Sequence, residues 1–218
     1  MDQATTHSAS GRVATLPPCW SCLAAGAGGL FCGACGVVQP PGQVDHFARL
    51  GLPCGFALDE AELDRRYFAL QRQLHPDRFV RRAPRERAIS QSQAASLNEA
   101  YEALRDPLGR AVYLLRLQGI DLEPPSGQTI SDPDLLMEAM EMREALAEAG
   151  DAAAVAMVAA RVEVERRTAL ATLAKAFADG GRDAAREATL RLKYLVKLDD
   201  DIRARRAAMG AAETKAVP

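Results

Sequence analysis

Apolar residues at helical spacing run through most of this 218-residue sequence, and this pattern limits the fold more than any other feature. Between Val44 and Gly119 they recur every three or four positions, which is the period of an amphipathic helix. Pro53, Pro84 and Pro107 break the pattern, because proline does not continue a helix interior. The segment is therefore predicted to contain four helices.

A second helical segment follows a short linker. Residues 120–130 are rich in proline and glycine, and the helical pattern then continues through residues 131–212. Interruptions around Gly150 and at Gly180-Gly181 divide this stretch into three helices, which leaves residues 213–218 as a tail. No segment sustains the alternation of a strand, so strands should be limited to short pieces around the cysteines. The predicted fold class is all-α, ending in a three-helix bundle.

The region before the helices, residues 1–43, is too short to fold on a hydrophobic core alone. It contains two Cys-x-x-Cys pairs with nine residues between them, namely Cys19 with Cys22 and Cys32 with Cys35. Four thiolates in tetrahedral array suit Zn²⁺, with iron or a cluster as the competing occupant. Such a site has no open coordination position, so we predict a structural metal module with a flexible N-terminus. A fifth cysteine, Cys54, stands alone and is expected in a buried or turn position.

A polar tripeptide separates two of the predicted helices. The first of them opens with a capping-box pattern at Asp59 and Glu62, and the face opposite its apolar stripe is basic. Pro76 disfavours α geometry at His75, so the helix must end there. His75-Pro76-Asp77 is then expected at the tip of an antiparallel hairpin, where it would form a contact surface. The arginines on the basic face and just beyond the tripeptide are Arg65, Arg66, Arg72 and Arg78.

The first helix after the linker carries two apolar stripes on opposite faces. The first stripe contains Leu135, Ala139, Met142 and Leu146. The second mixes flexible methionines with carboxylates and contains Leu136, Met137, Met140, Glu141 and Glu144. A helix needs one stripe to join a bundle, so the second is predicted to bind a partner. The alternative is a fully buried central helix with unusually placed acids.

Charge and hydropathy narrow the function classes. The 27 basic and 29 acidic residues nearly cancel, so the sequence shows no electrostatic footprint for nucleic acid and no polybasic membrane patch. No apolar run reaches the roughly 18 to 20 residues that cross a bilayer. The first 18 residues lack the apolar core of a secretory signal, and Arg12 is their only basic residue, which argues against a mitochondrial presequence. We expect an intracellular protein, with a bacterial cytoplasm preferred.

The stretch from Tyr67 through His75-Pro76-Asp77-Arg78-Phe79 resembles the second helix and loop of a J domain. The downstream blocks Ser96 to Leu104 and Asp106 to Leu115 resemble the HscB type of J protein, which serves iron–sulfur cluster assembly. This resemblance covers roughly residues 45 to 205. It assigns residues 44–119 to a J domain.

The resemblance implies a regulatory role. J domains of this family dock on a DnaK/HscA-class ATPase chaperone and stimulate its hydrolysis of ATP, so His75 is not expected to act as a general base. We expect Pro76 and Asp77 to act with it, and Arg65, Arg66, Arg72 and Arg78 to supply charge complementary to an acidic docking surface. The protein would therefore be a regulator of a partner ATPase and no enzyme itself.

The resemblance also assigns a client surface. The segment from Leu136 to Glu144 resembles the part of HscB-type proteins that binds the IscU-type cluster scaffold, so its methionine and glutamate stripe is expected to do the same. In the last helix the core stripe is predicted to contain Ala188, Leu192, Leu195 and Ile202. Tyr194 is expected to point off that stripe, and the family pattern suggests an aromatic contact with the scaffold there, although the bacterial form has phenylalanine.

The cysteine pairs, with Phe31 and Val38-Gln39-Pro40-Pro41, resemble the N-terminal extension of the eukaryotic members of the family. This similarity makes the mitochondrial matrix the alternative location. The sequence does not say what the module contacts, so self-association and stabilisation of the J domain both stay open.

Two other functions fit the cysteine pairs but not the remaining sequence. A zinc-knuckle binder of nucleic acid should show a basic stripe with aromatic residues, yet aromatics make up 5% of the chain. A zinc knuckle that binds protein remains the alternative function. A dithiol oxidoreductase would need a fold that positions its substrate beside a reactive thiolate, and the helical remainder offers none.

Overall fold

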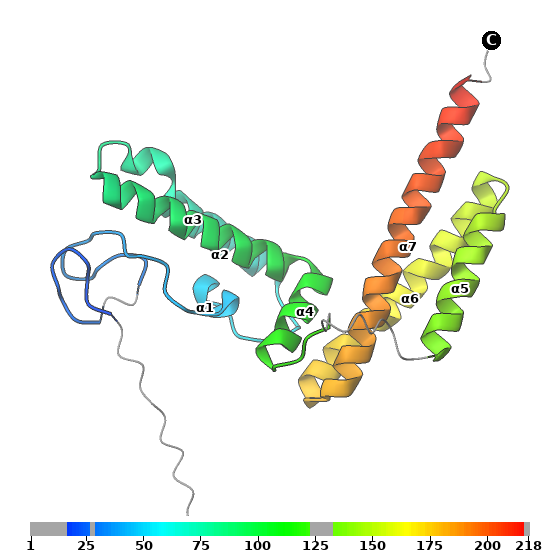
Figure 1. Cartoon of the computed structure of the whole chain (residues 1–218), viewed down its shortest axis with the longest axis horizontal. Helices are drawn as coiled ribbons and strands as arrows, with labels where there is room; N and C mark the ends of the chain where they lie inside the picture. The colour runs from blue at the N-terminus through cyan, green and yellow to red at the C-terminus, as the bar shows by residue number, and fades with distance from the viewer. Residues whose placement is uncertain (1–16, 27–28, 123–132, 216–218) are drawn as a thin grey trace, which may run out of the picture.

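The computed structural model describes residues 17–26, 29–122 and 133–215, and it shows an all-α protein in three parts (Figure 1). We call these parts the cysteine module (residues 17–39), the hairpin domain (residues 46–117) and the bundle (residues 133–215). Within the described residues, the one extended pairing is an isolated bridge between Phe31 and Val38 in the cysteine module. The predicted all-α fold is confirmed. Its helices are α1 His46–Leu50, α2 Glu60–Leu74, η1 Pro76–Phe79, α3 Pro84–Arg105, α4 Pro107–Leu117, α5 Pro133–Glu148, α6 Ala152–Asp179 and α7 Arg182–Lys215.

The hairpin domain is built on α2 and α3, which lie side by side (Figure 1). α2 begins where the Asp59 carboxylate accepts hydrogen bonds from the backbone amides of Ala61 and Glu62. Tyr67 of α2 stacks on Tyr101 of α3 with ring centroids 3.9 Å apart. The apolar stripes of the two helices meet around this pair, with Leu63, Leu74, Leu97, Ala100 and Leu104 buried. This packing holds the turn between the two helices at one end of the domain.

The bundle consists of the antiparallel pair α6 and α7, with α5 alongside and running in the same direction as α7 (Figure 1). The turn between α6 and α7 uses Gly180 in the left-handed region, at φ +72°. Arg191 of α7 pairs with Glu138 of α5 at 2.6 Å and with Glu165 of α6 at 2.9 Å, so one guanidinium joins all three helices. The predicted core stripes are confirmed, since Leu135, Ala139, Met142, Leu146, Ala188, Leu192, Leu195 and Ile202 are all buried.

The hairpin domain rests against the base of the bundle, where α4 contacts α7. Leu115 of α4 is buried against Ala176 and Ala185, and Phe56 stacks on Phe177 with centroids 5.5 Å apart. In Figure 1 the turn between α2 and α3 lies at the end of the hairpin domain away from this junction. Most of the predicted linker at residues 120–130 lies outside the described residues. None of the described helices is both long and apolar enough to cross a membrane.

Candidate functional sites

The four cysteine sulfurs of the module converge on one point. The Sγ atoms of Cys19, Cys22, Cys32 and Cys35 all lie within 4.8 Å of one another. The Sγ atoms of Cys19 and Cys35 are 3.8 Å apart, and those of Cys22 and Cys32 are 3.7 Å apart. A tetrahedron with Zn–S bonds of about 2.3 Å has edges of about 3.8 Å. A four-cysteine metal site is therefore present, and it is the only cluster of this kind in the described part of the chain.

Both cysteine pairs use the same backbone turn. The amide of Leu23 donates to the Cys19 carbonyl over 3.0 Å, and the amide of Gly36 donates to the Cys32 carbonyl over 2.8 Å. Leu23 and Gly36 both adopt the left-handed region, at φ +60° and +71°. Glycine takes that conformation without strain, whereas leucine does not. The turn aims both sulfurs of a pair inward, so the strain at Leu23 serves the metal site.

Hydrogen bonds prepare Cys19 to bind as a thiolate. Its side chain is fully buried, and burial alone would raise the pKa of the thiol. Hydrogen bonds from the backbone amides of Cys22 and Ser21 and from the side chains of Cys32 and Cys22 together outweigh this effect and lower the pKa of Cys19 to about 6. The side-chain amide of Gln39 also donates to the sulfur, with Nε2 and Sγ 3.4 Å apart. Metal ligation requires deprotonated sulfur, so these donors fit a bound cation.

His75, Pro76 and Asp77 are exposed at the tip of the hairpin domain. α2 ends at Leu74 and Pro76 starts η1, as expected from the restriction that proline places on the residue before it. The side chains of His75 and Asp77 are 56% and 85% exposed, and His75 Nδ1 lies 3.5 Å from the Asp77 carboxylate. Phe79 is buried and anchors η1 behind them. This exposure suits contact with another protein better than acid–base chemistry, which works best where water is excluded.

The predicted basic residues differ in how free their charges are. Arg72 and Arg78 are exposed. Arg65 and Arg66 both pair with Glu62, and Arg66 also donates to a backbone carbonyl between α1 and α2. The Glu62 carboxylate therefore pairs with these arginines and not with the backbone amide of Asp59. Only the Asp59 half of the predicted capping box forms. Arg66 is the arginine most committed to contacts within the domain.

The second stripe of α5 faces solvent. Leu136, Met137 and Met140 are 49%, 62% and 64% exposed, and Glu141 and Glu144 are also exposed. A fully buried α5, the alternative that the sequence left open, is therefore wrong. Leu136, Met137, Met140, Glu141 and Glu144 form what we call the α5 face. Sequence reasoning did not find its neighbour Arg161 of α6, whose guanidinium lies 3.9 Å from the Glu141 carboxylate.

Tyr194 does not point off the core stripe, and that prediction is wrong. Its side chain is 7% exposed, its hydroxyl donates to the Ala139 carbonyl of α5, and the guanidinium of Arg143 lies 5.4 Å from its ring centroid. Burial also raises the pKa of Tyr194. α7 packs against α5 as well as α6, so it buries a wider arc than one stripe. Arg143, which covers this ring, carried no signal in the sequence.

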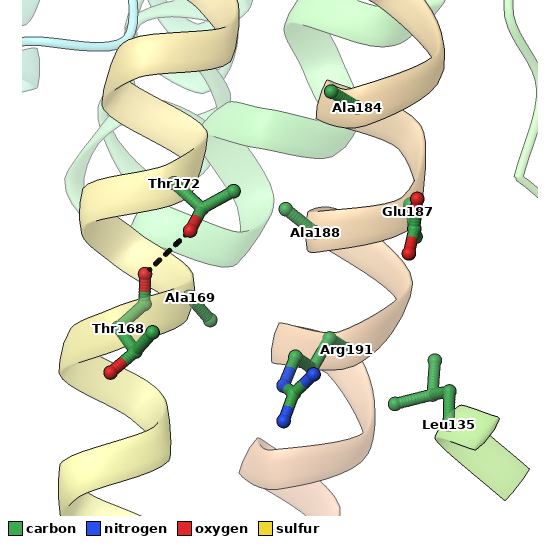
Figure 2. A pocket seen from close by; sticks show the side chains of 8 residues that line it. All are labelled: Leu135, Thr168, Ala169, Thr172, Ala184, Glu187, Ala188 and Arg191. Atoms are coloured by element: carbon green, nitrogen blue, oxygen red, sulfur yellow. Dashed lines mark hydrogen bonds between the residues drawn. The ribbon is translucent and has the colours of Figure 1, made fainter.

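A small cavity lies between α6 and α7 near the start of α5 (Figure 2). Its volume is about 220 Å³, and Leu135 faces it from α5. Thr172 donates to the Thr168 carbonyl, and Arg191 is engaged by carboxylates of two helices. The polar groups of Thr172 and Arg191 are thus used within the bundle, and we assign no chemistry to this cavity.

Cys54, in contrast to the clustered cysteines, is exposed in a bend between α1 and α2. Of the two settings predicted for it, the turn is therefore correct. It takes no part in the metal site.

A family model, curated sequences and solved structures all point to the same family. Residues 131–203 match the family model described as the HSCB C-terminal oligomerisation domain. The mouse iron–sulfur cluster co-chaperone protein HscB is 32% identical over 203 residues, which cover 91% of this chain and 86% of the mouse protein. The co-chaperone protein HscB homolog of Cupriavidus taiwanensis is 41% identical over 160 residues, which cover 72% of this chain and 90% of that protein. The crystal structure of human co-chaperone protein HscB matches with a TM-score of 0.82 at 31% identity, covering 87% of this chain and 98% of the human one.

Proposed function

Because the chain belongs to the HscB family of iron–sulfur cluster co-chaperones, we propose that it stimulates the ATPase of a DnaK/HscA-class chaperone and delivers an IscU-type scaffold to it. The observation that carries this proposal is the presence of two exposed surfaces of different chemistry on separate domains. One is the polar tripeptide at the hairpin tip, and the other is the α5 face. A protein that brings two partners together needs such a pair.

The tripeptide biases the chaperone between two conformations and takes no part in bond making. His75 and Asp77 meet the partner as exposed hydrogen-bonding groups, and Pro76 fixes the backbone between them. Arg72 and Arg78 add positive charge beside the tripeptide, which accelerates association with an acidic surface. The stimulation should therefore weaken as ionic strength rises.

The α5 face binds the scaffold. Met137 and Met140 adapt their shape to a partner, and their burial on binding supplies the apolar part of the affinity. Glu141 and Glu144 orient the complex by pairing with basic groups of the scaffold. Tyr194 acts mainly as a support, because its hydroxyl and ring hold α5 against α7 from below.

The four cysteines hold Zn²⁺ as a structural ion, with iron as the competing occupant. The ion would supply cross-linking and no chemistry, because four sulfur ligands complete its tetrahedral coordination. Metal content with thiol titration tests this role. One bound ion per chain with four protected thiols supports it, and freely reactive thiols without metal contradict it.

The main experiment measures steady-state ATP hydrolysis by the chaperone, with and without scaffold. His75→Gln should abolish stimulation under both conditions. The double variant Met137→Ala/Glu141→Ala should keep the basal stimulation and lose only the added effect of the scaffold. Val196→Ala/Asp200→Ala serves as its control, because these residues are exposed on α7 and have the same four-residue spacing. Absence of stimulation by the unmodified protein would rule out the proposal.

A further inference from the structure

Buried hydrogen bonds connect the metal site to α3. Gln39 donates from Nε2 to the Cys19 sulfur at 3.4 Å and to the Val37 carbonyl at 2.9 Å. The backbone carbonyl of Gln39 in turn accepts a hydrogen bond of 2.8 Å from Nε2 of Gln93 in α3. Gln39 and Gln93 are each 3% exposed, so water does not readily replace either bond. Gln39 therefore links the Cys19 sulfur to α3.

α3 continues this connection to the chaperone-binding tip. Ser90 lies three residues before Gln93 and therefore on the same face of the helix. Its hydroxyl donates to the carbonyl of Leu74 over 2.9 Å, and the Ser90 side chain is buried. Leu74 is the last residue of α2, directly before His75. The end of α2 is thus fixed by the same turn of α3 that holds the cysteine module.

Apolar and aromatic contacts also join the module to the hairpin domain. Val38 is 1% exposed and belongs to the core cluster that contains Leu74 and Phe79. The indole of Trp20 donates to the Val38 carbonyl over 2.7 Å, and the Arg85 guanidinium of α3 lies 4.4 Å from the indole centroid. In Figure 1 the module accordingly lies beside the end of the hairpin that carries the tip.

The module leaves space next to the tip. A cavity of about 230 Å³ lies between the second cysteine pair and η1, and Phe31, Val38, Arg78 and Phe79 line it. A shift of the module would let η1 move into or away from this space. Phe31 and Val38 of the module thus face Arg78 and Phe79 of η1 across this space.

We infer that the ion in the four-cysteine site sets the position of the His75-Pro76-Asp77 tripeptide, with Gln39, Gln93 and Ser90 as positioning residues. The inference rests on the proposed function for the tripeptide's role, whereas the coupling itself requires no chaperone. Loss of the ion removes the cross-link that holds Gln39 in place. Gln93 then loses its acceptor, and the turn of α3 that fixes Leu74 loosens.

Hydrogen exchange of the full-length protein tests the coupling without any partner. Three samples are compared, namely the Zn²⁺-loaded protein, the protein after chelation of the metal, and the loaded variant Gln93→Met. Methionine keeps the unbranched shape of glutamine but donates no hydrogen bond. Gln91→Met is the matched control, because Gln91 is exposed on the same helix. Metal content is measured in every sample.

We expect amides from His75 to Arg82 to exchange about ten-fold faster after chelation, while core amides of α7 around Leu195 stay unchanged. Gln93→Met should retain one ion per chain and still show several-fold faster exchange at the tip, and Gln91→Met should match the unmodified protein. Unchanged tip exchange in Gln93→Met with the ion bound would overturn the inference. That variant decides the matter even if chelation unfolds more of the chain.

The ATPase assay then separates this inference from the proposed function. If tip amides exchange faster in Gln93→Met and stimulation of the ATPase falls as well, the coupling and the proposed function are both supported. If the tip loosens but the unmodified protein never stimulates a chaperone, the coupling stands and the proposed function fails. If stimulation falls in Gln93→Met while tip exchange is unchanged, the positioning role is wrong.

Discussion

The cysteine module and the bundle bury very different amounts of apolar side chain. Among the described residues of the module, the buried apolar ones are Cys19, Cys32 and Val38, two of which belong to the metal site. In the bundle each helix contributes a full stripe, and Leu173, Leu195 and Leu198 are completely inaccessible. A segment as short as the module cannot gain enough from apolar burial, so its four-cysteine metal site takes the place of a core. The bundle needs no ion, because its three stripes meet one another.

The largest effect on folding should come from removing one sulfur of the metal site. Cys32→Ser leaves three thiolate ligands, and structural Zn²⁺ sites contribute on the order of 10 kcal/mol to small folded units. We expect loss of stoichiometric metal and of hydrogen-exchange protection across the module, with the bundle unchanged. Cys54→Ser is the matched control, since Cys54 is exposed and outside the cluster. Retention of one ion per chain in Cys32→Ser would contradict the division between the two regions.

Lowering the pH should reversibly remove the metal from the cysteine module while the bundle stays folded. Protons compete with the ion for the thiolates, and a thiol whose pKa is lowered on folding from 9.0 to about 6, as in Cys19, stabilises the fold at higher pH and stops doing so below about 6. The bundle carboxylate Glu163 has its pKa lowered to about 2 by hydrogen bonds from Arg166 and Arg167, so its contribution persists until much lower pH. Below about pH 6 the metal should be released while helical circular dichroism of the bundle is kept. Simultaneous loss of both signals would show that the regions are not independent.

In the bundle, truncation of one core side chain should lower stability by an intermediate amount. Leu195→Ala removes a fully buried side chain, which should lower the free energy of unfolding by about 3 kcal/mol. Chemical denaturation of the metal-loaded protein measures this. Val196→Ala, at a position 37% exposed on the same helix, should lower it by less than about 1 kcal/mol. Metal content should be unaffected in both variants, and its loss in Leu195→Ala would tie the two regions together.

Tyr194→Phe should give the smallest effect. It removes only the hydroxyl that donates to Ala139 and keeps the ring beneath Arg143, so stability should fall by about 1 kcal/mol. Thermal unfolding of the bundle measures the change. Scaffold affinity should stay nearly constant if Tyr194 only supports α5. A large loss of affinity with little loss of stability would instead make the hydroxyl a direct contact.

The same comparison explains which features could be predicted from the sequence. Helical period is local information, so the helices and core residues such as Leu63 and Leu195 followed from it. The spacing of the cysteines is local as well, and it identified the metal site. Tyr194 was misplaced because the width of a buried arc depends on how many helices surround α7, which one helix's own pattern does not contain. The contact of Gln39 with Gln93 joins two polar residues far apart in the chain, and no periodicity marks such a pair.

The stacked rings of Phe56 and Phe177, with Leu115 packed beside them, fix where the hairpin domain meets the bundle. This junction acts as a spacer between the tripeptide and the α5 face. Under the proposed function, the junction would set the distance and the direction between a chaperone at the tripeptide and a scaffold at the α5 face. Substitutions in either surface can change its affinity for a partner without changing the distance between the two surfaces. The separation of the two surfaces therefore depends on residues that belong to neither surface.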